Sequence, residues 1–377
     1  MKDVFITRLS HYLPNASICN EEMEDYLGMI EGVPSRVRSI VLRQNGIKNR
    51  YYALTKNQTP THTNAEMAVC AIRNLFEECE TWDDIELLVA ATSIPDQLIP
   101  SHASMIHGLL KNHPMELFSS SGVCLTAFQS LKTAYLSLAA GDKKKAICVA
   151  SERTSAALLS KHYTIEYERS HNVGENPYMA FEKDFLRFML SDGAGACLLS
   201  DRPEEGKCNL KLHWIEMHSY ANEKPTCMFM GGELNKDGEL NSWKDFDDEY
   251  LINRSVFAIK QDFKLLPTGV PLWVDHVRRT LKARNLEASD VDYVIPHVSS
   301  MFIYKLLAQA FENEKIELPE SKWFTNLSRI GNIGSASIFV ALEEFLKERE
   351  LPKGSKILLM IPESGRFNYG TALVETC

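Results

Sequence analysis

The sequence predicts an α/β fold made of two similar halves. Short, uncharged apolar runs that are typical of buried strands alternate with segments of helical periodicity. The same order of elements then occurs twice along the chain, and we place the boundary so that the halves cover residues 1–205 and 206–377. A repeated α/β unit of this size indicates two equivalent sheets that pack through helices.

In the first half, the predicted strands are residues 87–91, 115–118, 145–150 and 194–200. Cys124 follows the second of these strands after a turn of small residues, and the helix after it has an apolar stripe and ends at Gly141. Glu152 follows the third strand. Polar residues after strands are notable because α/β folds place their sites at the carboxyl ends of strands.

The second half repeats this order, with predicted strands at residues 291–295, 323–327, 356–361 and 369–374. Pro296-His297 follows the first of them, and Gly331-Asn332 opens a small-residue turn before a helix. Gly365 follows the third strand. Asn332 therefore occupies the position in this half that Cys124 occupies in the first.

Other segments are expected outside this repeated core. Residues 158–188 are polar and aromatic and are predicted to form an insertion or lid. Residues 219–248 are predicted to form a second long loop. Apolar periodicity predicts helices over 251–265 and 272–283.

Composition excludes several classes of function. The chain has 377 residues and a net charge of −9, so broad affinity for nucleic acid or an anionic membrane is not expected. Its nine cysteines include no CxxC pair and no cluster with zinc spacing, which indicates reduced thiols, no structural metal and a cytoplasmic protein. The N-terminus resembles a first strand, and no apolar run approaches the ~20 residues that span a bilayer.

Each candidate site residue has a simpler explanation. Cys124 fits a buried structural thiol as well as a nucleophile, although a place in the first turn of a helix is expected to lower its pKa. His297 alone fits a core histidine, and Asn332 alone fits a helix cap. Their equivalent positions in a repeated frame favour a shared site.

The order Cys124, Pro296-His297 and Gly331-Asn332, with Ser335-Ala336-Ser337 after it, resembles the thiolase-fold condensing enzymes. The whole chain is most similar to the β-ketoacyl-acyl-carrier-protein synthase III group. Further matching segments are Gly46-Ile47-Lys48-Asn49-Arg50, Thr92-Ser93-Ile94-Pro95-Asp96, Ser191-Asp192-Gly193-Ala194-Gly195-Ala196 and Gly365 with Tyr369-Gly370. The resemblance implies a duplicated, five-layered α-β-α-β-α thiolase-like fold and a homodimer.

The resemblance also implies a reaction. Cys124 would take an acyl group from a thioester, and His297 and Asn332 would hold the enolate of a malonyl- or β-ketoacyl-type thioester. Backbone N–H groups of Cys124 and Gly365 would form the oxyanion hole for decarboxylative Claisen condensation. The substrates would be thioesters of acyl carrier protein or coenzyme A, with no further cofactor and no metal. Glu152 would be structural, or a general base if a cyclisation follows.

Several positions depart from the family pattern. The family's tryptophan that stacks on coenzyme A and a nearby arginine correspond to Ile40 and Gln44, which favours a carrier-bound donor. The family's carrier-docking arginine is missing, with Phe302 in its place and Lys305 nearby. Val298-Ser299-Ser300 follows the histidine, and residues 362–367 replace a glycine-rich loop. Residues 362–367 resemble the corresponding loop of ketosynthases that form dialkylresorcinols and cyclohexanediones.

Two alternatives to a ketosynthase remain. The first is an acyltransferase that moves the Cys124 acyl group to a hydroxyl or amine, and the second is an inactive partner subunit. Basic residues that could meet an acidic carrier, or simply lie on solvated surfaces, are Lys143, Lys144 and Lys145, and Arg278, Arg279, Lys282 and Arg284.

Overall fold

The computed structural model describes residues 1–78, 80–163, 184–207 and 209–377. Within them, one large sheet has the strand order β13-β14-β15-β8-β1-β7-β6-β4-β5. Its strands are β1 Phe5–Tyr12, β4 Leu87–Thr92, β5 Glu116–Ser121, β6 Lys145–Glu152, β7 Gly193–Ser200, β8 Leu210–Ser219, β13 Tyr293–Pro296, β14 Lys356–Glu363 and β15 Asn368–Thr376.

This sheet consists of two equivalent half-sheets. In one, β4 is parallel to β6, β6 antiparallel to β7, and β7 antiparallel to β1. In the other, β13 is parallel to β14, β14 antiparallel to β15, and β15 antiparallel to β8. The half-sheets join where Phe5 and Ile6 of β1 pair with Lys211 and Leu210 of β8. The matching order confirms the predicted duplication.

One predicted strand is wrong. Residues 323–327 form a single parallel bridge, Trp323 to Val294, at the place that β5 takes in the first half. The chain cannot continue as a strand because the short helix α11 (Leu327–Ile330) begins directly afterwards.

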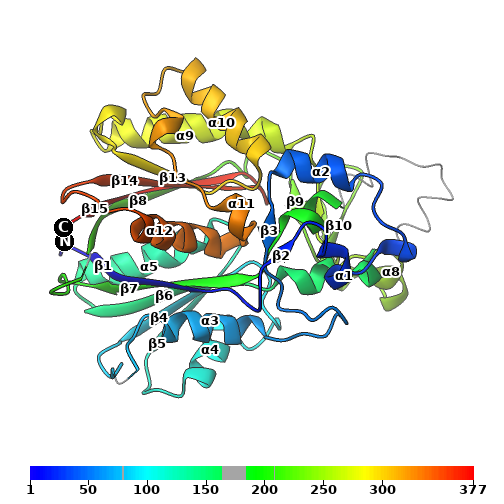
Figure 1. The fold of residues 1–377 in the computed structure, drawn as a ribbon, viewed down its shortest axis with the longest axis horizontal. Coiled ribbons are helices and arrows are strands. Elements are labelled where there is room, and N and C mark those ends of the chain that lie inside the picture. The colour runs from blue at the N-terminus through cyan, green and yellow to red at the C-terminus, as the bar shows by residue number, and fades with distance from the viewer. Residues whose placement is uncertain (79, 164–183, 208) are drawn as a thin grey trace.

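Helices cover the half-sheets in layers (Figure 1). Helices α5 (Thr126–Ala140) and α12 (Ser337–Glu348) lie between the half-sheets, where Phe128 and Phe339 are buried in one core. Helices α3 (Asn64–Arg73) and α4 (His102–Leu110) cover the first half-sheet, and α9 (Val270–Ala283) and α10 (Met301–Asn313) cover the second. The five-layered α-β-α-β-α architecture is thus confirmed.

Local sequence explains these elements. Strand β4 (Leu-Leu-Val-Ala-Ala-Thr) is buried along its whole length, as expected of a strand covered by helices on both faces. Helix α3 begins with a capping box, in which the Thr63 hydroxyl accepts from the Glu66 N–H and the Glu66 carboxylate accepts from the Thr63 N–H. These two bonds satisfy donors that a helix start otherwise leaves free.

Strands β4, β5, β6, β13 and β14 all end at the same side of the molecule. Strand β14 ends at Glu363, which pairs with Asn368 at the start of β15, and β15 runs back to the C-terminus. In Figure 1 both termini lie at the opposite side. The loops that follow these five strands therefore converge, and they carry Cys124, His297 and Glu152.

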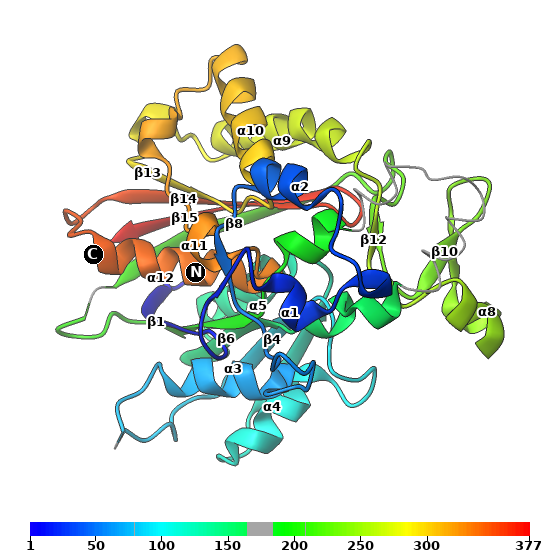
Figure 2. The same ribbon diagram turned by 45° about the vertical axis from the view of Figure 1, so that its right-hand side comes forward.

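Smaller elements surround this end (Figure 2). They are β2 Ile18–Cys19, β3 Asn49–Arg50, α1 Met23–Leu27, α2 Arg38–Asn45, β9 Met228–Phe229, β10 Gly232–Leu234, β11 Leu240–Ser242, β12 Lys260–Gln261 and α8 Asp248–Asn253. Residues 219–248 thus contain paired strands where a plain loop was predicted. Helix α9 confirms the prediction for residues 272–283.

The helix predicted over 251–265 is wrong. Helix α8 stops at Asn253, Ser255 has a left-handed φ of 46°, and β12 then pairs with β9. Ile252 is 63% exposed whereas Val256 is fully buried, so the apolar stripe does not lie on one face. The apolar residues of this stretch pack against different neighbouring segments and do not share one buried face.

The predicted lid at 158–188 is wrong at its C-terminal end. Residues 184–189 are helical, and Phe185, Leu186, Phe188 and Met189 lie in the core beside the second half-sheet. Residues 164–183 lie outside the described part. Short 3₁₀ turns cover Thr154–Leu158 and Ser160–His162.

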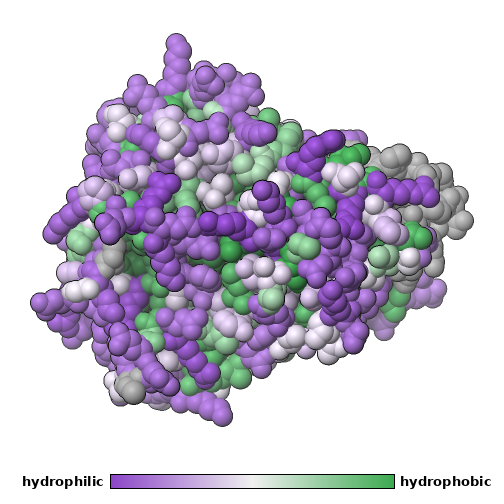
Figure 3. All heavy atoms as spheres, in the orientation of Figure 1, coloured by the Kyte–Doolittle hydropathy of each residue, from purple (hydrophilic) through white to green (hydrophobic). Residues whose placement is uncertain are grey.

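The surface in Figure 3 is largely hydrophilic, with apolar residues in small separate groups. Across the described residues, no helix combines the length and apolarity needed to cross a membrane. The same residues contain no group of three or more histidine, cysteine or acidic side chains placed to hold a metal ion.

Candidate active site

A cavity of ≈50 Å³ opens where the strand ends converge, and Cys124, His297 and Glu363 line it. The cavity lies between the start of α9, α10 and the β14–β15 hairpin. Its other walls are mostly apolar, with Leu266, Val270, Trp273, Ile303, Phe367 and Tyr369. The structure therefore brings two of the three predicted catalytic side chains to one space.

Cys124 lies in the turn after β5, two residues before the first residue of α5. It was predicted in the first helical turn, but the capping position is Leu125. Burial raises the pKa of its thiol, and the carboxylates of Glu363 and Glu152 raise it further. The expected lowering of this pKa is therefore wrong, because a buried thiolate loses more hydration energy than the helix start returns. The resting thiol is neutral and must lose its proton when it reacts.

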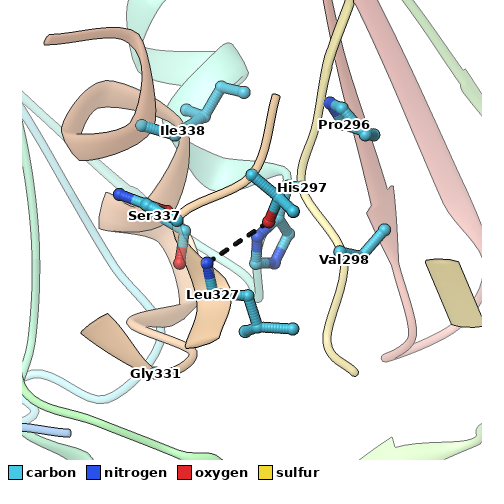
Figure 4. A pocket seen from close by; sticks show the side chains of 10 residues that line it. Pro296, His297, Val298, Leu327, Gly331, Ser337 and Ile338 are labelled. Carbon is cyan, nitrogen blue, oxygen red and sulfur yellow. Dashed lines mark hydrogen bonds between the residues drawn. The ribbon is translucent and has the colours of Figure 1, made fainter. Parts of the chain in front are cut away.

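His297 follows β13 and is fixed by its backbone, whose N–H donates to the carbonyl of Met360 at 2.8 Å. Burial lowers the pKa of its imidazole to about 4, so the ring is neutral near pH 7. The residue also lines a second, smaller space with Leu327, Gly331 and Ser337, which Figure 4 shows around it. His297 thus separates the two cavities.

Asn332 follows Gly331, which lines this second cavity. Its Oδ1 accepts from the N–H of Gly334 at 2.9 Å, and its backbone bonds to Met189 and Ser191 on both sides. The side chain is held with Oδ1 occupied, so Nδ2 is the end that can donate. Asn332 is not among the described residues that line either cavity, so the structure does not place it beside Cys124.

Glu152 connects the two halves of the chain. Its Oε1 accepts from the backbone N–H of Ser93 at 3.0 Å and of Ser335 at 3.2 Å, and from both hydroxyls. The side chain is fully buried, and burial raises its pKa. These bonds occupy the carboxylate and direct it at serines of both halves, which favours a structural role.

Gly365 lies in the turn between β14 and β15. Its carbonyl accepts from the N–H groups of Cys227 and Met228, at 2.9 and 3.2 Å. A Cβ at this position would come within 3.1 Å of Val123, the residue before Cys124. The lack of a side chain lets the turn pack on the Cys124 loop, and the oxyanion-hole role of its N–H stays a prediction.

Sequence reasoning assigned no role to Glu363, the last residue of β14. Its Oε1 accepts from Nδ2 of Asn368 at 2.6 Å, and its Oε2 accepts from the N–H of Val123 at 3.4 Å. The side chain is buried, and burial raises its pKa. A signal was present, because Glu363 directly follows the apolar run of residues 357–362 and is the one acid at this strand end.

The residues that depart from the family pattern also have places. Ser300 is fully buried and accepts from the N–H of Ile303, so it caps α10 behind His297. Ile40 on α2 and Phe302 on α10 are each 42% exposed, on helices that pack together. Both side chains are therefore exposed apolar residues on this surface.

The two basic groups are largely paired with acids. Lys143 bonds to Glu116 and Asp142, and Lys145 to Asp84. On α9 and just beyond it, the pairs are Arg278–Glu314, Arg279–Asp275 and Arg284–Glu216. Such pairing reduces the positive potential that either surface offers to an acidic partner.

The chain is similar to known proteins in sequence and in fold. Residues 281–375 match the family "3-Oxoacyl-[acyl-carrier-protein (ACP)] synthase III C terminal". A β-ketoacyl-[acyl-carrier-protein] synthase III of Clostridium perfringens is 24% identical over 379 residues, which cover all of both chains.

Solved structures show the same fold over nearly the whole chain. A 3-oxoacyl-[acyl-carrier-protein] synthase III from Aquifex aeolicus superimposes with a TM-score of 0.69 at 21% identity, covering 99% of each chain. A tetronic acid condensing enzyme superimposes with a TM-score of 0.75 at 20% identity and the same coverage. Residues 281–375 therefore match the C-terminal part of 3-oxoacyl-[acyl-carrier-protein] synthase III, and the whole chain is similar to members of this family, which are condensing enzymes of the acyltransferase class.

Proposed function

We propose that the protein loads an acyl group on Cys124 and condenses it with a malonyl- or β-ketoacyl-type thioester. The observation that carries this proposal is that Cys124 and His297, from different halves of the chain, line one buried cavity. A thiol nucleophile and a neutral donor at one apolar space suit carbon–carbon bond formation between thioesters.

In the first step, Sγ of Cys124 attacks the thioester carbonyl and the carrier thiol leaves with the proton that Cys124 gives up. One thioester replaces another, so the exchange costs little free energy. The N–H groups of Cys124 and Gly365 stabilise the tetrahedral oxyanion. Donors of this kind typically contribute roughly 3 kcal/mol each to the transition state.

In the second step, His297 and Nδ2 of Asn332 donate to the carbonyl oxygen of the second thioester. Loss of CO₂ from a malonyl group leaves an enolate, whose carbon attacks the acyl group on Cys124. Because the imidazole of His297 is neutral, it donates a hydrogen bond to this oxygen and carries no positive charge that would stabilise an anion elsewhere. The step needs no metal or redox cofactor, because the released CO₂ drives it.

The proposed acyl donor is carried by acyl carrier protein. Ile40, which is exposed, and Gln44 stand where family members that bind coenzyme A carry a tryptophan and an arginine, so stacking on the adenine of coenzyme A is not supported. The acid at Glu363 and the loop after it support a specialised member of the family over one that starts ordinary fatty acids.

We also propose a homodimer formed through β5. This strand is the last in the sheet order, pairs with β4 on one side only, and exposes 47% of Phe118. An open, partly apolar strand edge is a ready surface for a second copy of the same strand. Because Cys124 follows β5 directly, such a dimer would brace the site.

The acyltransferase alternative makes a different prediction. Transfer to a hydroxyl or amine needs Cys124 and an oxyanion hole but no donors for an enolate. Asn332 is held with its donor end free, which favours condensation over simple transfer.

The test is to incubate the protein with an acyl-carrier thioester and malonyl-carrier thioester, and to follow CO₂ and product mass. We expect acylated Cys124, CO₂ and a product with a new carbon–carbon bond. Asn332→Ala should keep acylation and slow CO₂ release by roughly a hundredfold or more. Acylation with transfer to water, hydroxyls or amines, and no CO₂, would support the acyltransferase instead.

A further inference from the structure

We propose that Glu363 is the general base for a β-ketoacyl thioester, so that this substrate condenses without loss of CO₂. The inference rests on the proposed function, and it names both a further catalytic residue and the class of the second substrate. It starts from the position of a carboxylate in an otherwise apolar cavity.

Of the described residues that line the Cys124 cavity, Glu363 alone carries a carboxylate. The group lies in a notch between the Cys124 loop and the β14–β15 turn. A Cβ built on Gly122 would lie 3.6 Å from its Oε2, and one on Gly365 would lie 3.4 Å from its Oε1. These are ordinary van der Waals distances, so the carboxylate packs directly against both the loop that carries Cys124 and the β14–β15 turn.

Hydrogen bonds fix the carboxylate but do not exhaust it. Oε1 accepts from Asn368 and Oε2 accepts from the N–H of Val123, and the backbone of Leu125 also donates to the carboxylate. A carboxylate has about four acceptor positions, so these three bonds leave one for a substrate proton. This differs from Glu152, whose Oε1 takes four bonds from Ser93 and Ser335.

The chemistry of the second substrate decides whether a base is needed. A malonyl thioester forms its enolate by losing CO₂ and needs no base. A β-ketoacyl thioester has no carboxylate to lose, so its enolate forms only when a base removes a proton from the carbon between the two carbonyls. Only the second case therefore needs a base to form the enolate, and a buried carboxylate next to the nucleophile can supply it.

Two groups in the cavity could accept that proton. Burial lowers the pKa of His297 to about 4, so its ring is a weak acceptor and remains a donor to the enolate oxygen. Burial raises the pKa of Glu363, which strengthens it as a base. His297 therefore acts as the hydrogen-bond donor to the enolate oxygen, and Glu363 acts as the base.

The step balances. Glu363 takes the proton from the carbon between the carbonyls, and the enolate carbon attacks the Cys124 thioester. The new carbon–carbon bond forms as the bond from the acyl carbon to Sγ breaks. The departing Cys124 thiolate then takes the proton from Glu363, which restores both groups.

The test compares two second substrates on the acylated protein, a malonyl and a 3-oxoacyl thioester of N-acetylcysteamine. Glu363→Gln keeps the size of the side chain but cannot accept the proton. We expect it to lower kcat for the 3-oxoacyl substrate by roughly 100- to 10,000-fold, and for malonyl by much less. Glu363→Asp should recover part of the loss, and Glu312→Gln, exposed on α10, serves as the matched control.

The outcomes separate this inference from the proposed function. Equal losses for both substrates in Glu363→Gln, or no loss, would overturn the role of Glu363. A wild-type protein that condenses malonyl but not 3-oxoacyl thioesters would overturn the inference and leave the proposed function intact. Failure of Cys124 to become acylated by any thioester would overturn both.

Discussion

The burial of Cys124 has two opposing effects on its reaction. Its burial keeps water from an acyl-enzyme, but burial and two carboxylates also raise the pKa of the free thiol. The thiol must therefore lose its proton as the thioester arrives, not before. Glu363 lies where it can assist, since it bonds to the residue preceding Cys124.

The site residues differ in how far the sequence predicts them. Cys124 and His297 follow strand ends, and Asn332 lies in a small-residue turn at the equivalent place in the repeat, so the sequence alone shows their positions. Glu363 escapes because its importance depends on a cavity formed by α9, α10 and the hairpin. The sign of the Cys124 pKa shift escapes for a similar reason, because the depth of burial is a property of the packed molecule.

Glu152 provides a prediction at the same scale. Glu152→Ala removes the acceptor of four hydrogen bonds and leaves donors of Ser93 and Ser335 buried without a partner. We expect a loss of about 3 kcal/mol in the free energy of unfolding, since each unsatisfied buried group costs about 1–3 kcal/mol. Urea unfolding followed by circular dichroism measures this loss.

Glu152→Gln is the matched variant, because its amide oxygen can still accept from both serines. We expect a smaller loss of stability and acylation at close to the wild-type rate. Wild-type stability in both variants together with abolished turnover would show that Glu152 acts as a base and not as a link between the halves.

At the scale of elements, edge strand β5 allows a test of the proposed dimer. Phe118→Glu places a charge on the exposed side of the strand, where a second copy would pair. We expect this substitution to raise the dissociation constant of the dimer at least tenfold, as measured by sedimentation at several protein concentrations. Leu136→Glu, on the exposed side of α5, is the control. A wild-type protein that sediments as a monomer at all concentrations would contradict the proposal.

Periodicity predicts the core elements well and the peripheral ones poorly. Helix α9 is amphipathic and packs on the second half-sheet, so its pattern reflects one buried face. Residues 251–265 show a similar pattern, but Ser255 turns the chain and the apolar residues cover different neighbours. A pattern predicts a helix only when one continuous surface produces it.

For the whole molecule, the main consequence of duplication is that each half completes the other. Glu152 of the first half bonds to Ser335 of the second, and Glu363 of the second bonds to Val123 of the first. The cavity contains Cys124 from one half and His297 from the other. The relative position of the halves therefore sets the geometry of the site.

Buried histidines predict the acid sensitivity of this assembly. Burial lowers the pKa of His276 from 6.5 to about 3, and its ring bonds to Thr371 and His218. The folded ring stays neutral while the unfolded one gains a proton below about 6.5, so its contribution to stability is present above that pH and lost on acidification. Buried carboxyls with raised pKa act in the opposite sense, so a variant must isolate the effect.

We expect the difference in unfolding free energy between wild type and His276→Asn to fall by roughly 2 kcal/mol from pH 7.5 to 5. Urea unfolding of both proteins at several pH values measures it. A difference that stays constant over this range would mean that His276 is protonated in the folded protein.

The central claim is that Cys124 carries the acyl group, and intact-protein mass spectrometry with peptide mapping tests it most directly. After incubation with an acyl thioester, the wild-type protein should gain the mass of one acyl group, located on the peptide that contains Cys124. Cys124→Ala should gain none while remaining folded. No adduct on the wild type, or an equal adduct on Cys124→Ala, would contradict the account.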